Sequence, residues 1–96
     1  MKKRVSILTD RMDRCYVCDS VDNVEIHEIF YGPKRNSSIR YGLVVPLCAE
    51  HHRGPYGVHG SKGKMINVSL KEEGQRAFEK QYPATDFMTV FGKNYL

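Results

Sequence analysis

The sequence has few of the features that mark a membrane protein or a disulfide-stabilised one. No apolar run is long enough to span a bilayer, and three cysteines cannot all pair with one another. We find no signal peptide or apolar export segment, so the chain is expected in a reducing cytoplasm, where clustered thiols more often hold metal than form disulfides. No membrane partner is expected.

Internal repeats and low-complexity segments are also lacking, and the chain is short. Its 96 residues suit one domain, assigned to residues 1–96, but a hydrophobic core of this size stabilises a fold only marginally. The composition, with 41% hydrophobic and 10% aromatic residues, is that of an ordered protein. Something besides the core must therefore contribute to stability.

The order of hydrophobic and turn-forming residues predicts an α+β fold. Runs rich in β-branched and aromatic residues predict strands over 5–8, 23–31 and 39–45, with a loop over 34–38. Pro46 is expected to end the pairing of the last strand.

Helices are expected mainly in the C-terminal part, about residues 69–92. A short helix over 49–53 precedes a glycine-rich loop over 54–63. Ser69 and Glu72 form a capping-box pattern that predicts a helix over 70–82. A final helical turn is predicted after Thr85-Asp86, ended by Gly92.

Two pairs of potential metal ligands share one spacing. Two residues separate Cys15 from Cys18 and Cys48 from His51, and 29 residues lie between the pairs. Such spacing lets a tight turn direct both side chains at one ion, and two such pairs complete the four-coordinate site that structural zinc prefers. The alternative, three cysteines buried as small apolar residues, does not explain the repeated spacing. We therefore predict a structural Zn²⁺ site whose binding is coupled to folding.

Positive charge is concentrated in the middle of the chain. Residues 31–64 hold six basic residues and one acidic residue, whereas residues 15–30 hold four acidic residues and no lysine or arginine. Basic loops attract the phosphate backbone of nucleic acids, although a solvated surface loop is the alternative interpretation. The candidate phosphate contacts are Lys34, Arg35, Arg40, Arg53, Lys62 and Lys64.

The residues around the cysteines resemble a known family. About residues 15–59 resemble the zinc-containing HNH endonucleases. The resemblance rests on four features in order: Cys-x-x-Cys, a strand carrying Ile26-His27-Glu28-Ile29, a hydrophobic strand into Leu47-Cys48, and Cys48-Ala-Glu-His51-His52. Residues 25–32 and 41–52 are most similar to small HNH proteins encoded by bacteriophages. The resemblance implies a ββα-metal fold that holds one divalent cation against the scissile phosphate, in a bacterial or phage-infected cell.

The resemblance also implies roles for individual residues. Cys15, Cys18, Cys48 and His51 would be the zinc ligands, and His52 would bind the catalytic ion, which is Mg²⁺, Mn²⁺ or another divalent ion. His59 would be the second downstream ligand, although Gly54–Gly57 delays it relative to the family spacing. The middle Asn of the family is replaced by Gly42-Leu43, and Asn36 is a candidate for its loop-fixing role.

The end of the first strand can be aligned with the family in two ways. The family has a metal ligand followed by a general base there. In register, His27 is the ligand and Glu28 the base; by residue type, His27 is the base and Glu28 the ligand. Imidazole titrates near neutral pH and is suited to taking a proton from water, which favours His27 as the base.

The expected function is metal-dependent hydrolysis of phosphodiester bonds in DNA. One active site per chain predicts nicking of one strand rather than cutting of both. Two non-catalytic alternatives stay open, a zinc-stabilised nucleic-acid-binding module and a structural zinc protein that binds another protein.

Overall fold

The computed structural model describes residues 4–96, and over these residues the α+β class predicted from the sequence is confirmed. The elements in chain order are β1 (Glu25–Glu28), the 3-10 turn η1 (Gly32–Lys34), α1 (Arg35–Arg40), β2 (Val44–Leu47), α2 (Ala49–Arg53), α3 (Lys64–Gln81) and α4 (Phe87–Phe91).

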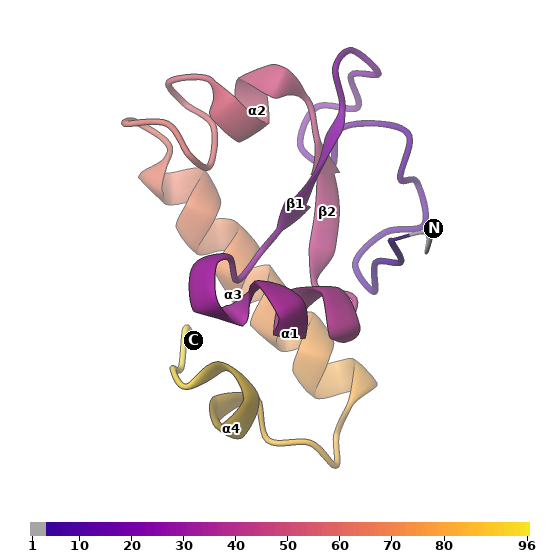
Figure 1. The fold of residues 1–96 in the computed structure, drawn as a ribbon, viewed down its shortest axis with the longest axis vertical. Helices are drawn as coiled ribbons and strands as arrows, with labels where there is room; N and C mark the ends of the chain where they lie inside the picture. Colours follow the sequence, from indigo (N-terminus) through magenta and orange to yellow (C-terminus); the bar gives the residue numbers. More distant parts are fainter. Residues whose placement is uncertain (1–3) are drawn as a thin grey trace.

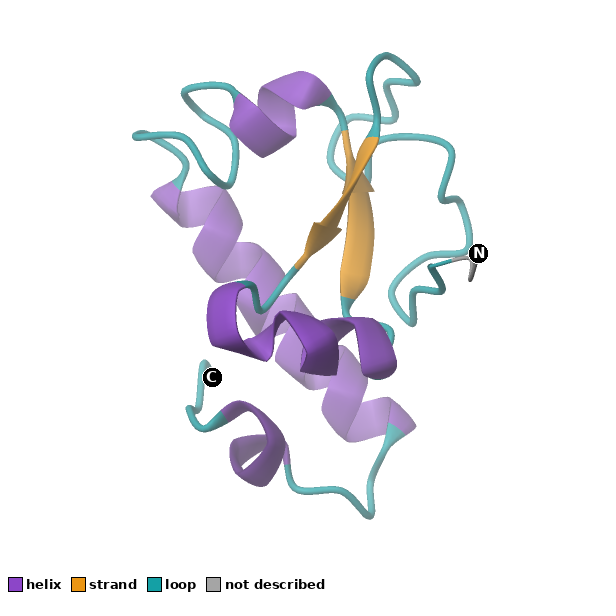
Figure 2. Cartoon of the chain, viewed as in Figure 1, coloured by secondary structure: helices purple, strands orange, loops and turns teal. Residues whose placement is uncertain are grey.

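A β-hairpin lies at the centre of the structure. β1 and β2 pair antiparallel, with His27 opposite Val45 (Figure 1). Helix α1 connects the strands at one end of the hairpin, and α2 follows β2 at the other end (Figure 2). The long helix α3 runs diagonally behind the hairpin, from the side of α2 toward that of α4 (Figure 1).

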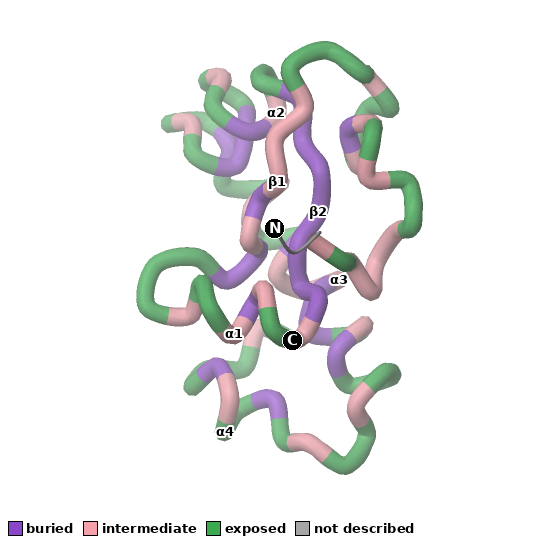
Figure 3. The backbone as a smooth tube through the Cα atoms, turned by 45° about the vertical axis from the view of Figure 1, so that its right-hand side comes forward, coloured by how far each residue is buried: buried purple, intermediate pink, exposed green. Residues whose placement is uncertain are grey.

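The core lies between the hairpin and the C-terminal helices. β2 is buried along its whole length (Figure 3), because Leu43, Val45 and Leu47 pack in one cluster with Leu70 and aromatic side chains. The ring of Phe30 lies 5.4 Å from Phe87 and 4.7 Å from Phe91, centroid to centroid. The predicted final turn is confirmed, since Asp86 accepts a hydrogen bond from the Thr89 amide and Gly92 ends the helix at a φ of 77°.

The predicted strand over 39–45 is wrong in its first half, where α1 lies. The helix ends at Gly42, whose φ is 74°, and hydrogen bonds from the Gly42 amide to Ile39 and from the Leu43 amide to Ser38 form a Schellman motif. Ile39 and Tyr41 are residue types common in strands, which is why a strand was predicted here. The glycine permits the left-handed conformation that closes a helix, and the strand begins only at Val44.

Pro46 was expected to end the pairing of the strands, but it lies within β2 opposite Ile26. Its carbonyl oxygen points away from β1 and accepts a hydrogen bond of 2.7 Å from the Tyr16 amide. In an antiparallel pair both backbone groups of a residue point to the same side, so a proline at this position removes no hydrogen bond between the strands.

Three further boundaries differ from the sequence predictions. The strand expected over 23–31 is limited to β1, and residues 5–8 form no strand, although the Ile7 amide donates to the Gly42 carbonyl. Helix α3 begins at Lys64, so Ser69 is an interior residue whose hydroxyl donates to Glu73 and caps nothing. Tertiary packing of Ile66 and Leu70 against the core explains the longer helix. Within residues 4–96 no helix is long and apolar enough to cross a membrane.

Candidate metal centres

The two predicted ligand pairs come together at one end of the hairpin. Cys15 and Cys18 flank a tight turn in which the Asp19 amide donates to the Cys15 carbonyl, and the Tyr16 amide docks this turn on the edge of β2. Cys48 follows β2 directly and precedes the short helix α2, as predicted. One helical turn therefore brings His51 to the same side as Cys48.

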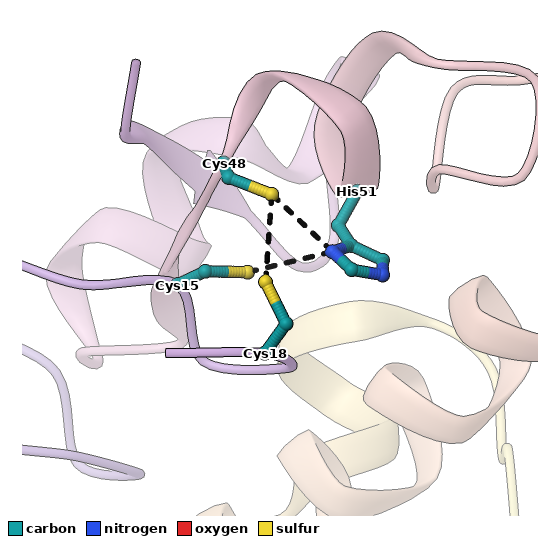
Figure 4. A group of neighbouring side chains, drawn as sticks. All are labelled: Cys15, Cys18, Cys48 and His51. Carbon is teal, nitrogen blue, oxygen red and sulfur yellow. Dashed lines mark hydrogen bonds between the residues drawn. The ribbon is translucent and has the colours of Figure 1, made fainter. Parts of the chain in front are cut away.

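The ligand atoms have the separations of a tetrahedral site. Nδ1 of His51 lies 3.3 Å from Sγ of Cys48 and 3.8 Å from Sγ of Cys15, and the sulfurs of Cys18 and Cys48 are 3.8 Å apart (Figure 4). Ligands about 2.0–2.3 Å from a tetrahedral ion lie roughly 3.3–3.8 Å from each other. Figure 4 shows the three sulfurs and the imidazole turned toward a common centre. These four residues can hold one metal ion.

The surroundings favour the thiolate form that a metal requires. Burial opposes ionisation of the Cys15 thiol, but hydrogen bonds from the backbone of Cys48, Cys18 and Val17 outweigh it and lower its pKa to about 7. A thiolate is therefore accessible near neutral pH at the most buried of the three cysteines.

A second group of potential ligands consists of His27, His52 and His59. One nitrogen from each ring lies within 4.8 Å of one nitrogen from each of the others. The ring centroids are 5.3 Å apart for His27 and His52, 5.1 Å for His27 and His59, and 4.9 Å for His52 and His59. These three histidines come from β1, from α2 and from the loop after α2. They can hold a second ion.

The glycine-rich loop brings His59 back to α2 despite its delay in the sequence. The Val58 amide donates to the carbonyl of His51, and the His59 amide donates to that of His52. Gly63 passes so close to the Gly57 carbonyl that a Cβ would overlap it, so this compact path depends on glycine. The loop therefore returns His59 to the side of α2 that carries His52.

The surroundings of His27 suit a metal ligand better than a general base. It is 2% exposed, and its Nε2 has no hydrogen-bond partner within the described part of the chain. Burial, with the charges of His59, His52 and Lys71, lowers its pKa to about 3, so the imidazole is neutral at pH 7. A neutral, unpartnered nitrogen is ready to bind a metal, whereas so low a pKa makes a weak proton acceptor.

Glu25 is a candidate site residue that the sequence analysis did not identify. Its carboxylate accepts hydrogen bonds from Nδ1 of His52 at 3.0 Å and from Nε of Arg53 at 2.8 Å. The hydrogen bonds from His52 and Arg53 lower the pKa of Glu25, so it stays ionised and can only accept. Nδ1 of His52 therefore carries the proton and Nε2 is left free for a metal, which is the usual arrangement of a metal-binding histidine.

Replacing Glu25 with alanine is expected to weaken metal binding at the three histidines by about 10–100-fold, the usual cost of losing the partner of a histidine ligand. Binding of Mn²⁺ measured by calorimetry checks this, with Glu50→Ala as a control on an exposed residue of α2. Equal affinity in the two variants would show that Glu25 does not orient His52.

Glu28 is not brought into the histidine group. Its carboxylate accepts a hydrogen bond of 2.9 Å from Nε of Arg35, and its neighbour His27 is the residue of β1 that joins His52 and His59. The sequence favoured His27 as the base and Glu28 as the ligand. The arrangement instead favours the other alignment, in which His27 is the ligand. Of these two adjacent residues, only His27 therefore supplies a ligand atom to the group.

The loop between the strands is fixed by Ser38 and not by Asn36. The Ser38 hydroxyl accepts from the Phe30 amide at 3.0 Å and donates to the Phe30 carbonyl at 2.9 Å, and the residue is fully buried. Asn36 is exposed on α1. Because α1 was not predicted, nothing in the sequence indicated that Ser38 faces the end of β1.

The six basic residues do not form one free surface. Arg35 and Arg53 are paired with Glu28 and Glu25, while the side chains of Arg40 and Lys62 lie over the rings of Tyr41 and Tyr56. Lys34 and Lys64 have no ion pair within residues 4–96. Four of the six candidate phosphate contacts thus already have a partner in the fold.

Two ligand groups therefore flank α2, one of cysteines with His51 and one of histidines alone. His51 and His52 are consecutive in α2, so their side chains diverge and each joins a different group.

Comparison of the chain with protein families, curated proteins and solved structures found no match.

Proposed function

We propose that this protein is a metal-dependent endonuclease that hydrolyses phosphodiester bonds in DNA, with structural Zn²⁺ at the cysteine site and Mg²⁺, Mn²⁺ or another divalent ion at the histidine site. The observation that carries the proposal is the convergence of His27, His52 and His59 around a buried, unpartnered imidazole nitrogen. The element order β1, β2, α2, with His27 on β1 and His52 on α2, agrees with the ββα-metal arrangement of the HNH endonucleases that the sequence resembles.

Three neutral imidazoles leave the charge of a bound divalent ion uncompensated. An ion held by His27, His52 and His59 would supply electrostatic stabilisation of the developing phosphorane and of the leaving 3′ oxygen. The three histidines would supply one ligand fewer than the closed, four-ligand site of a structural metal. A protein site made of carboxylates would cancel more of that charge.

Glu28 is the residue that we assign as the general base. It is the neighbour of a metal ligand on β1, and its side chain is partly exposed, so water can reach it. Arg35, which donates to the same carboxylate, would hold it in one orientation. In this assignment Glu28 would take the proton of the attacking water, and His27 would be a ligand of the ion.

The test is cleavage of a supercoiled plasmid by the purified protein with Mg²⁺, Mn²⁺, Ni²⁺ or Zn²⁺. We expect relaxed circles with at least one ion and none with EDTA, because one site per chain cuts one strand. A protein that binds DNA in a salt-dependent way but relaxes no plasmid with any ion would instead be the non-catalytic nucleic-acid-binding module. A protein with neither property would be a structural metal protein.

A further inference from the structure

Next to the three histidines lies a lysine that the proposed chemistry has not used. Lys71 is on α3, and its Nζ lies 4.8 Å from the centre of the Tyr31 ring and 5.6 Å from that of Tyr95. Two aromatic rings thus hold the ammonium group by cation–π contacts. Lys71 has no carboxylate partner within the described residues.

Tyr31 links this ammonium to the histidine group. Its ring lies 5.0 Å from that of His59 and 5.8 Å from that of His27, centroid to centroid. Its hydroxyl accepts a hydrogen bond of 2.9 Å from the side-chain amide of Asn67, one helical turn before Lys71.

The other ring is held just as firmly. The Tyr95 amide donates to the buried side chain of Gln75 at 2.7 Å, and the Tyr95 ring packs 5.2 Å from Phe30. The segment that carries Tyr95 is therefore fixed against α3, and it leads to the chain end marked C in Figure 1. Since both rings are anchored, Lys71 has less freedom to lose when it binds an anion.

We propose that Lys71 contacts a nonbridging oxygen of the phosphate that binds at His27, His52 and His59. An unpaired cation near three imidazoles that can themselves hold a divalent cation makes a site for an anion and not for a further metal. The ligand is a phosphodiester of the nucleic-acid backbone. This inference rests on the proposed function for the place of that phosphate.

Lys71→Met keeps the aliphatic stem against the two tyrosines and removes the charge. We expect its cleavage rate at saturating DNA to fall by about 10²-fold, the effect of losing one positioned contact to transition-state charge, with Mn²⁺ affinity unchanged. Lys71→Arg should recover part of that rate because it keeps the charge over both rings. Lys93→Met is the matched control, since Nζ of Lys93 lies 5.3 Å from the Tyr95 ring centre but over no other ring.

A second measurement does not depend on cleavage. The slope of log affinity for duplex DNA against log salt concentration should become shallower by about 0.9 in Lys71→Met and stay unchanged in Lys93→Met. Equal behaviour of the two variants in rate and slope would overturn the inference and leave the proposed function standing. If the wild-type protein cleaves no DNA, the proposed function fails, and only the salt slope then tests the Lys71 contact. An unchanged slope in Lys71→Met would refute that contact.

Discussion

Cys48→Ser is expected to abolish cooperative unfolding of this protein and to remove the metal of the cysteine site. Cys48 is 6% exposed and links β2 to α2, and its sulfur is the nearest of the three to His51. With zinc as the ion, as we propose, binding contributes roughly 10–16 kcal/mol to folding. The whole stability of a domain of this size is about 5–15 kcal/mol.

The measurements are thermal unfolding followed by circular dichroism and elemental analysis of the purified protein. Val17→Ser is the matched control, because Val17 lies between two ligands, is exposed and supplies no ligand atom. We expect the control to retain one bound ion and a sharp transition. A Cys48→Ser protein that unfolds cooperatively at the wild-type temperature would contradict a structural role for the cysteine site.

His59→Ala is expected to lower the rate of DNA cleavage by about 10³-fold while leaving the fold intact. His59 is exposed on its loop, so its replacement removes little buried surface, yet it supplies one of three ligands to the proposed catalytic ion. A metal ion that stabilises the transition state by several kcal/mol accounts for a loss of this size when its site is opened.

The variant also separates the two metal sites. Metal bound at the cysteine site should be retained, and only the weaker, exchangeable ion should be lost, which a titration with Mn²⁺ followed by electron paramagnetic resonance detects. Ser61→Ala, in the same loop, controls for changes of loop conformation. Wild-type cleavage by His59→Ala would remove the histidine group from the mechanism, whatever the outcome for Cys48.

The elements that the sequence predicted well are those fixed by local spacing. The Cys-x-x-Cys and Cys-x-x-His pairs each span about one turn, so their convergence needed only one long-range contact. The last helical turn was also predicted, since Asp86 caps it and Gly92 ends it by rules that act within one turn. The region around α1 was misread because Ile39 and Tyr41 have strand-like side chains, and the Schellman motif at Gly42 overrode that preference.

The sequence by itself determined which residues can form the cysteine site and that an α+β fold surrounds it. Only the tertiary structure decided that His27 joins His52 and His59, that Glu25 is hydrogen-bonded to His52, and that Lys71 lies between Tyr31 and Tyr95. The physical reason is that these contacts join residues far apart in the chain. Their distances depend on the register of the hairpin, the fold of the glycine-rich loop and the docking of α3, which no local pattern specifies.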